Sequence, residues 1–88
     1  MYKIKDGFIV RNIGGRSMAV PTGKRTSEIH GMIALSESGE LLWHTLENGA
    51  DIDTLSQILT DNYEVDSVTA FADAKKFVEG LEEQGVLE

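Results

Sequence analysis

The residue pattern of the chain changes at Ser36, and this change most constrains the possible folds. Residues 8–13 (FIVRNI) are β-branched or aromatic at four of six positions, which favours a strand. After Ser36 the apolar residues recur about every 3.6 positions, the period of an amphipathic helix. Strands followed by helices indicate an α+β fold, because α/β proteins alternate the two elements along the chain.

The length of 88 residues limits the chain to one domain over residues 1–88, since so short a chain can bury only one modest core. The absence of Cys excludes a disulfide framework and Cys-based zinc sites. No apolar run approaches the roughly 18 residues of a membrane span, and the N-terminus lacks the apolar stretch of a signal peptide. We therefore expect a cytoplasmic domain.

Three strands are predicted before the change in pattern. Residues 8–13 form the first, and Gly14-Gly15 permits the positive φ angles of a tight hairpin. Residues 16–21 return as the second strand, and residues 22–28 are polar and predict a loop. The third strand is predicted at Ile29–Leu35. Together they form a three-stranded antiparallel sheet.

Three helices are predicted after the sheet. Ser36, Asp51 and Asp66 are suitable N-cap residues for them, and the third helix covers about residues 67–84 before Gly85. Three strands followed by three helices match a winged helix-turn-helix with its wing placed first. The third helix has an apolar arc about 120° wide, formed by Ala70, Phe71, Ala74, Phe77, Val78 and Leu81.

Gly39 lies on the apolar stripe of the first predicted helix, beside Leu42 and Leu46. Glycine has no Cβ, so another backbone is able to come close to the helix at this position. We therefore expect a second backbone segment near Gly39.

The charge of the chain is divided along its length. The formal net charge is −7, but residues 1–35 carry six basic and two acidic residues, a charge of +4. Residues 36–88 carry two basic and thirteen acidic residues, a charge of −11. The predicted third helix has more carboxylates than lysines on its polar face, which disfavours contact with DNA phosphates. A winged-helix DNA-binding regulator remains the alternative, and it predicts salt-dependent binding of duplex DNA.

No set of side chains predicts a catalytic centre. Glu40, His44 and Glu47 share a helix face but are interpreted as a solvated polar surface, because nothing in the sequence supplies supporting partners for a metal. His30 is interpreted as structural or surface-exposed. Ser36 is interpreted as a helix cap, and Gly14-Gly15 as a turn. We expect no enzyme activity, cofactor or metal.

The third strand is the segment that most suggests a function. Residues 29–35 contain no charged residue and no Pro, the usual devices that protect a sheet edge. Such a strand either lies inside the sheet or under a helix, or pairs through its open backbone with an extended peptide. A third possibility is that the same edge pairs with a second copy of the chain. The apolar arc of the third helix also has two interpretations: it supplies side-chain pockets for a peptide on this strand, or it lies wholly in the core.

An ordered set of short motifs extends from about Phe8 to Leu87. The motifs are Arg11, Ala19-Val20-Pro21-Thr22-Gly23, Gly31-Met32-Ile33, Leu35-Ser36-Glu37-Ser38-Gly39 with Leu42-Trp43, Tyr63-Glu64-Val65-Asp66, Ala70, Asp73, Phe77 and Leu81. This set resembles the PqqD-like family, whose members are the peptide modification chaperones, or recognition elements for precursors of ribosomally made, post-translationally modified peptides. The sequence has His30 where the family commonly has Asn, and Ala74 where a larger aliphatic residue is common.

The resemblance implies a non-catalytic adaptor with a winged-helix fold. It would bind the leader region of a precursor peptide as an added strand and present it to a modifying enzyme, often a radical S-adenosylmethionine enzyme. The residues expected to bind the peptide lie on the third strand and the third helix: Gly31, Met32, Ile33, Ala34 and Leu35, with Phe71, Ala74, Lys75 and Val78.

Overall fold

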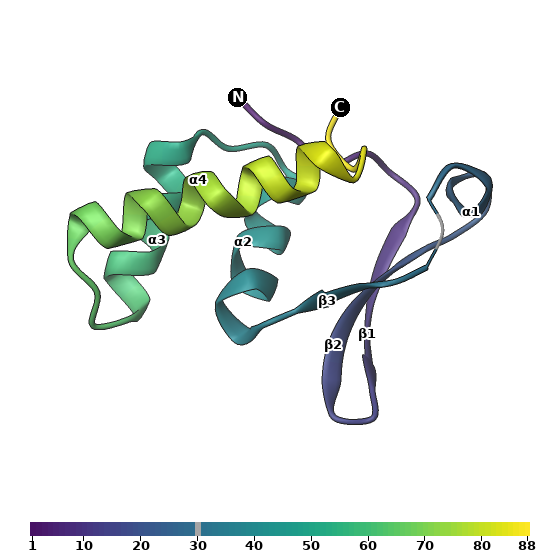
Figure 1. The fold of residues 1–88 in the computed structure, drawn as a ribbon, viewed down its shortest axis with the longest axis horizontal. Coiled ribbons are helices and arrows are strands. Elements are labelled where there is room, and N and C mark those ends of the chain that lie inside the picture. Colours follow the sequence, from purple (N-terminus) through teal and green to yellow (C-terminus); the bar gives the residue numbers. More distant parts are fainter. Residues whose placement is uncertain (30) are drawn as a thin grey trace.

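The structure is a computed structural model, and it describes residues 1–29 and 31–88. It is an α+β fold in which a three-stranded antiparallel sheet is followed by helices, as predicted (Figure 1). The elements in chain order are β1 (Phe8–Ile13), β2 (Arg16–Pro21), α1 (Arg25–Glu28), β3 (Ile33–Leu35), α2 (Glu37–Glu47), α3 (Ile52–Asn62) and α4 (Ser67–Glu83).

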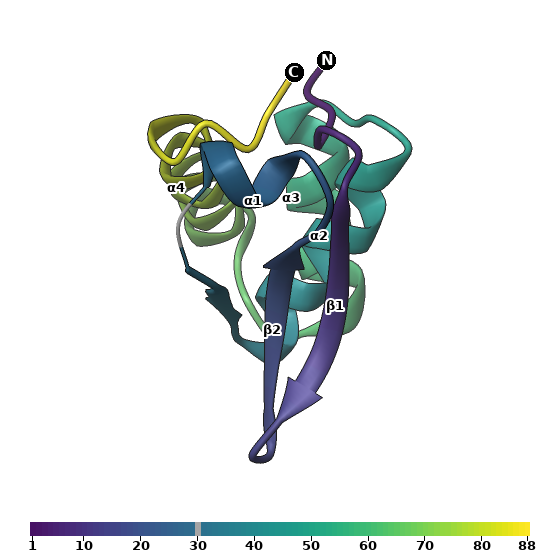
Figure 2. The ribbon, with the colours of Figure 1, turned by 90° about the vertical axis from the view of Figure 1, so that its right-hand side faces the viewer.

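The sheet has the order β1-β2-β3, so β2 is central and β3 lies at an edge (Figure 2). Gly14 and Gly15 have φ angles of 60° and 83° and form the predicted hairpin turn between β1 and β2. One face of the sheet packs on the core through residues such as Phe8 and Ala19. The other face is exposed and includes Ile9, which is 38% exposed.

The region between β2 and β3 differs from the prediction in two ways. Residues 22–28 were expected to be a loop, but they contain the one-turn helix α1. The third strand, expected over Ile29–Leu35, begins only at Ile33. Ile29 is buried directly after α1, and Gly31 has a φ angle of +94°, so the chain turns before it enters the sheet. The interpretation of His30 lies outside the described residues.

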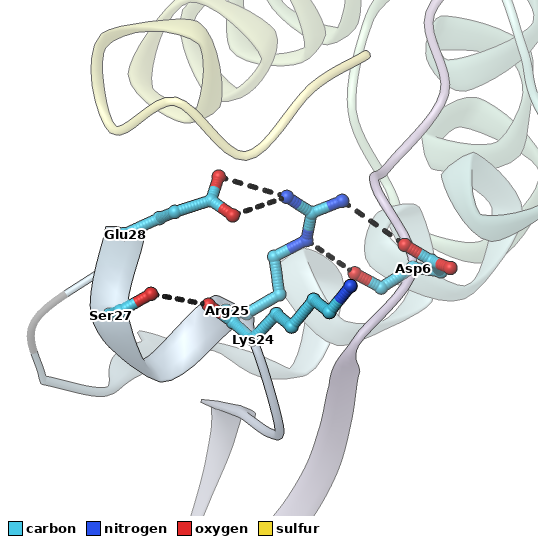
Figure 3. A network of polar contacts seen from close by, with 5 residues as sticks. All are labelled: Asp6, Lys24, Arg25, Ser27 and Glu28. Carbon is cyan, nitrogen blue, oxygen red and sulfur yellow. Dashed lines mark hydrogen bonds and ion pairs between the residues drawn. The ribbon is translucent and has the colours of Figure 1, made fainter.

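Arg25 explains why α1 forms where a loop was expected (Figure 3). Its Nε donates to the backbone oxygen of Asp6 at 2.8 Å, and its two terminal nitrogens bind the carboxylates of Asp6 and Glu28 at 3.1 and 3.0 Å. Gly7 leaves room for this side chain, since a Cβ there would lie 2.5 Å from Arg25 Cγ. Arg25 therefore holds α1, which leads to β3, against the segment before β1.

The three longer helices begin at the predicted caps. The side chains of Ser36, Asp51 and Asp66 accept hydrogen bonds from the backbone N–H groups three residues later, at 3.0, 2.8 and 2.7 Å. Each bond satisfies one of the N–H groups that a helix start leaves without an intrahelical partner. Helix α4 ends one residue earlier than predicted, at Glu83, and Gly85 follows with a φ angle of +73°.

The core lies between the sheet and the three longer helices. Trp43 of α2 is fully buried, and its ring meets Phe8 of β1 edge to face with centroids 5.5 Å apart. The N-terminal segment adds to this core through Ile4, which is 4% exposed and pairs with Leu87 in an isolated bridge. Within the described residues, no helix is both long enough and apolar enough to cross a membrane.

Candidate functional site

The hairpin determines which backbone groups of β2 face β3. Ile13 and Arg16 flank the two-residue turn, and such a pair exchanges both of its backbone hydrogen bonds. In an antiparallel ladder these pairs alternate with pairs whose N–H and C=O groups point away from each other. The backbone groups of Ser17 and Ala19 therefore point away from β1, toward β3.

The same alternation continues into β3 and leaves one residue facing outward. Ser17 is opposite Leu35 and Ala19 is opposite Ile33, so these two pairs form the ladder between β2 and β3. Ala34 lies between them, and its N–H and C=O point away from β2. Ala34 is exposed, and the described part of the chain has no strand on that side. We call this backbone side of Ala34 the free edge.

Helix α4 lies on the same side of the molecule as the free edge. In Figure 1, β3 and α4 cross the view in opposite directions, with α4 nearer the front. In Figure 2, β3 is the strand nearest to α4. The third strand and the third long helix were predicted to bind the peptide together. In the structure they lie on the same side of the molecule.

Two of the predicted helix residues lie inside the core rather than on an open surface. Ala74 is 0% exposed and Val78 is 1% exposed, and both belong to the buried stripe of α4. Phe71 is 44% exposed and Lys75 is exposed, so these two side chains are accessible. The prediction placed all four on one wall, but in the structure only Phe71 and Lys75 reach the surface.

Phe77 identifies the flank of α4 that faces the end of β3. A Cβ at Gly39 would lie 3.3 Å from Phe77 Cε1 and 4.0 Å from Leu35 Cδ2, so the three residues meet. Phe71 is six residues before Phe77, which places it about 120° around the helix. Phe71 and Lys75 therefore lie on the opposite flank of the buried stripe from Phe77.

Sequence reasoning did not assign Asp73 and Gly80 to the site, although both share the flank of Phe77. At 100° per residue they lie within about 60° of it. Gly80 is half-buried, and a Cβ at this position would meet no heavy atom of the described residues within 4 Å. We call Asp73, Phe77 and Gly80 the α4 flank. Gly39 was the sequence feature that pointed to this flank, but a backbone was expected beside it, whereas the structure has the side chain of Phe77 there.

A hollow lies where the end of β3 and the α4 flank come together. It has a volume of about 260 Å³ and is lined by Ser36, Glu37, Ser38, Leu59, Tyr63, Val65 and Asp73. Ser36 directly follows β3, whereas Asp73 belongs to the α4 flank. We call this hollow the Tyr63 pocket.

Glu40, His44 and Glu47 form a surface cluster, consistent with the predicted solvated face. His44 Nδ1 lies 2.7 Å from Glu47 Oε1, and Nε2 lies 3.5 Å from Glu40 Oε2. The hydrogen bond with Glu47 raises the pKa of His44 above its usual value. Among the described residues, no group of three or more His, Asp or Glu side chains has the geometry to hold a metal ion.

Comparison with known families extends these observations over most of the chain. Residues 18–87 match the family model described as coenzyme PQQ synthesis protein D, PqqD. The chain belongs to the PqqD family. The match begins within β2 and includes β3 and all three long helices, and therefore the free edge and the α4 flank. A search of curated proteins found no match to the chain.

Two solved structures share the fold of this PqqD-family chain. One is TbiB1 in complex with the TbiA(beta) leader peptide, with a TM-score of 0.75 and 22% identity, covering 98% of this chain and 94% of that one. The other is a lasso peptide synthetase B1 complexed with its leader peptide. Its TM-score is 0.75 at 21% identity, and the alignment covers 99% of this chain and 96% of that one.

Proposed function

We propose that this protein is a non-catalytic adaptor that binds the leader region of a ribosomal precursor peptide by adding it as a strand to β3. The free edge at Ala34 is the observation that carries the proposal. Its N–H and C=O point away from β2, so an extended peptide is able to complete a fourth strand. The PqqD family and the two leader-peptide complexes with the same fold support this proposal.

The peptide would bind along Gly31–Leu35, including Met32, with backbone hydrogen bonds at the free edge. A net contribution of about 0.5–1.5 kcal/mol per hydrogen bond gives only modest affinity from a strand this short. Side-chain contacts must therefore provide much of the affinity and all of the selectivity between peptides. We propose that the α4 flank supplies these contacts, because Phe77 faces the end of β3 and the space beside Gly80 is open.

Phe71 and Lys75 offer the alternative wall that was expected from the sequence. Both are accessible, but they lie on the other flank of the buried stripe. In that case Ala74 and Val78 would not contact the peptide, and as core residues they would only hold α4 in place. The two flanks make different predictions, which paired variants distinguish.

The adaptor would present the bound leader to a separate modifying enzyme, which we propose is a radical S-adenosylmethionine enzyme. Leader peptides are ribosomal products, so the adaptor would meet them in the cytoplasm. The chemistry of modification would come entirely from the partner.

Backbone amide spectra during a peptide titration test the proposal. Isotope-labelled protein is titrated with synthetic leaders taken from the short reading frames that neighbour its gene. We expect chemical-shift changes concentrated at residues 31–35 and along α4, with slower exchange of the Ala34 amide once it gains a partner. Shift changes confined to the hairpin at residues 12–18, or no binding by any neighbouring leader, would overturn the proposal.

A further inference from the structure

We infer that the Tyr63 pocket receives one large apolar side chain of the bound peptide, and that a Lys or Arg stands next to that side chain. The inference rests on the proposed function, since it names the kind of leader that the adaptor selects. It concerns a different part of the surface from the free edge.

The lining of the pocket suits an apolar side chain. Leu59 belongs to the buried core, and Tyr63 and Val65 pack against that core while remaining partly accessible. The volume of about 260 Å³ accommodates a side chain of the size of leucine or phenylalanine. Burying such a side chain contributes more affinity than one further backbone hydrogen bond in water.

The pocket adjoins both proposed walls of the peptide site. Ser36 follows β3 directly, and Asp73 lies one helical turn before Phe77 on the α4 flank. A strand advances about 3.3 Å per residue, so a peptide paired at Ala34 reaches Ser36 within about two residues. Side chains alternate between the two faces of a strand, and Ala34 is on the exposed face. The peptide side chain three residues beyond the one opposite Ala34 therefore faces the helices and arrives at the pocket.

The charges around the pocket favour a basic neighbour for the apolar side chain. Glu37 and Asp73 both line the pocket and are exposed, and no Lys or Arg is among its lining residues. The pocket also lies within residues 36–88, the part of the chain that carries the charge of −11. A peptide with a Lys or Arg beside its apolar anchor complements this rim.

A phage-displayed library of random 12-residue peptides provides the probe. Selection on the wild-type protein should enrich peptides that carry a large apolar residue next to Lys or Arg. The best enriched sequence is then synthesised, and its Kd is measured for the wild type and for four variants: Ser38→Trp, Gln57→Trp, Asp73→Lys and Ala34→Pro. Each variant is first checked for an unchanged thermal transition.

Ser38→Trp tests the pocket, because Ser38 lines it from the first turn of α2 and a large ring there fills the space. We expect at least a tenfold loss of affinity. Gln57→Trp is the matched control on the exposed surface of α3, and it should bind as the wild type does.

Asp73→Lys reverses one rim charge, and it should weaken binding at least threefold at low salt but much less at high salt. Because Asp73 is exposed, this variant keeps the test valid even if Ser38→Trp does not fold.

The outcomes separate the pocket from the proposed function. If enriched peptides bind and lose affinity in an Ala34→Pro variant, but neither Ser38→Trp nor Asp73→Lys weakens them, the pocket inference is wrong and strand addition stands. If the wild type enriches no peptide at all, both fail. Enrichment of acidic rather than basic neighbours would also overturn the inference about the rim.

Discussion

Phe77 of α4 occupies the space that Gly39 of α2 leaves open. A Cβ on Gly39 would lie 3.3 Å from Phe77 Cε1 and 3.1 Å from the Oγ of Ser36, which caps the same helix. The buried stripe of α4 and this contact together fix how the helix is rotated about its own axis, and the contact sets Phe77 toward the end of β3. The flank of α4 that faces the proposed peptide therefore depends in part on one glycine in a different helix.

Gly39→Val should lower the free energy of unfolding by about 1–3 kcal/mol, because the added atoms crowd both Phe77 and Ser36. Gly80→Ala is the control, since a Cβ at Gly80 meets no neighbour and alanine is the better helix former. It should raise the free energy of unfolding by about 1 kcal/mol. Urea unfolding of both variants checks the pair, and equal effects would contradict the packing described here.

Ala34→Pro should leave the fold intact and weaken leader binding about tenfold. The ring removes an N–H that points away from β2, so no bond of the sheet is lost. Ile33→Pro is the contrasting variant, because Ile33 bonds to Ala19 within the sheet and its loss should lower the melting temperature. Calorimetry and peptide titration on both variants check the assignment. A destabilised Ala34→Pro protein would show that the register has been assigned wrongly.

Gly80→Leu and Lys75→Leu distinguish the two flanks of α4. Both introduce the same side chain into the same helix, but only Gly80 shares the flank of Phe77. We expect Gly80→Leu to reduce leader affinity at least tenfold by filling the space beside β3, whereas Lys75→Leu changes it less than twofold. The reverse order in a fluorescence titration would favour the wall of Phe71 and Lys75 expected from the sequence.

Ala74→Arg should prevent stable folding, because Ala74 is 0% exposed and the guanidinium would be buried without a partner. A loss of about 3–5 kcal/mol is expected for an unpaired buried charge, against a total stability of about 4–13 kcal/mol for a chain of this length. Ala72→Arg, at an exposed position of the same helix, should unfold like the wild type. A folded Ala74→Arg protein that no longer binds leader would instead place Ala74 at the peptide.

Asp66→Asn should make the stability less dependent on acid pH. The hydrogen bond from the Thr69 backbone N–H lowers the pKa of Asp66 below its ordinary value. A lowered pKa in the folded state gives a contribution that is present above the ordinary value and is lost as pH falls through the lowered one. Asparagine still caps the helix but does not titrate. The drop in melting temperature between pH 6 and pH 2.5 should therefore be smaller in the variant than in the wild type, and an equal drop would contradict the assignment.

The features predicted correctly from the sequence are those set by neighbouring residues. The caps at Ser36, Asp51 and Asp66 and the turn at Gly14-Gly15 depend on contacts within about three residues, so local patterns are sufficient to identify them. The buried stripe of α4 likewise follows from its 3.6-residue period.

The features that were missed depend on residues far apart in the sequence. Helix α1 is held by Arg25, which binds Asp6 across 19 positions, and no local pattern indicates that partner. The period of α4 predicted an apolar arc but not its rotation, which depends on the contact between Phe77 and Gly39. For the same reason Ala74 and Val78 were assigned to an open wall, although both are in the core.

The two ends of the described chain are joined by backbone pairing. The Glu88 N–H donates to the Lys3 oxygen at 2.8 Å, the Lys5 N–H donates to Val86, and both ends lie at the top of Figure 1, opposite the hairpin tip. A short linker could therefore connect residue 88 to residue 1, and a circularly permuted protein opened at Gly14-Gly15 should keep this pairing. A fluorescent protein attached at either end would stand away from Ala34, which makes the fold suitable for a genetically encoded sensor of leader peptides.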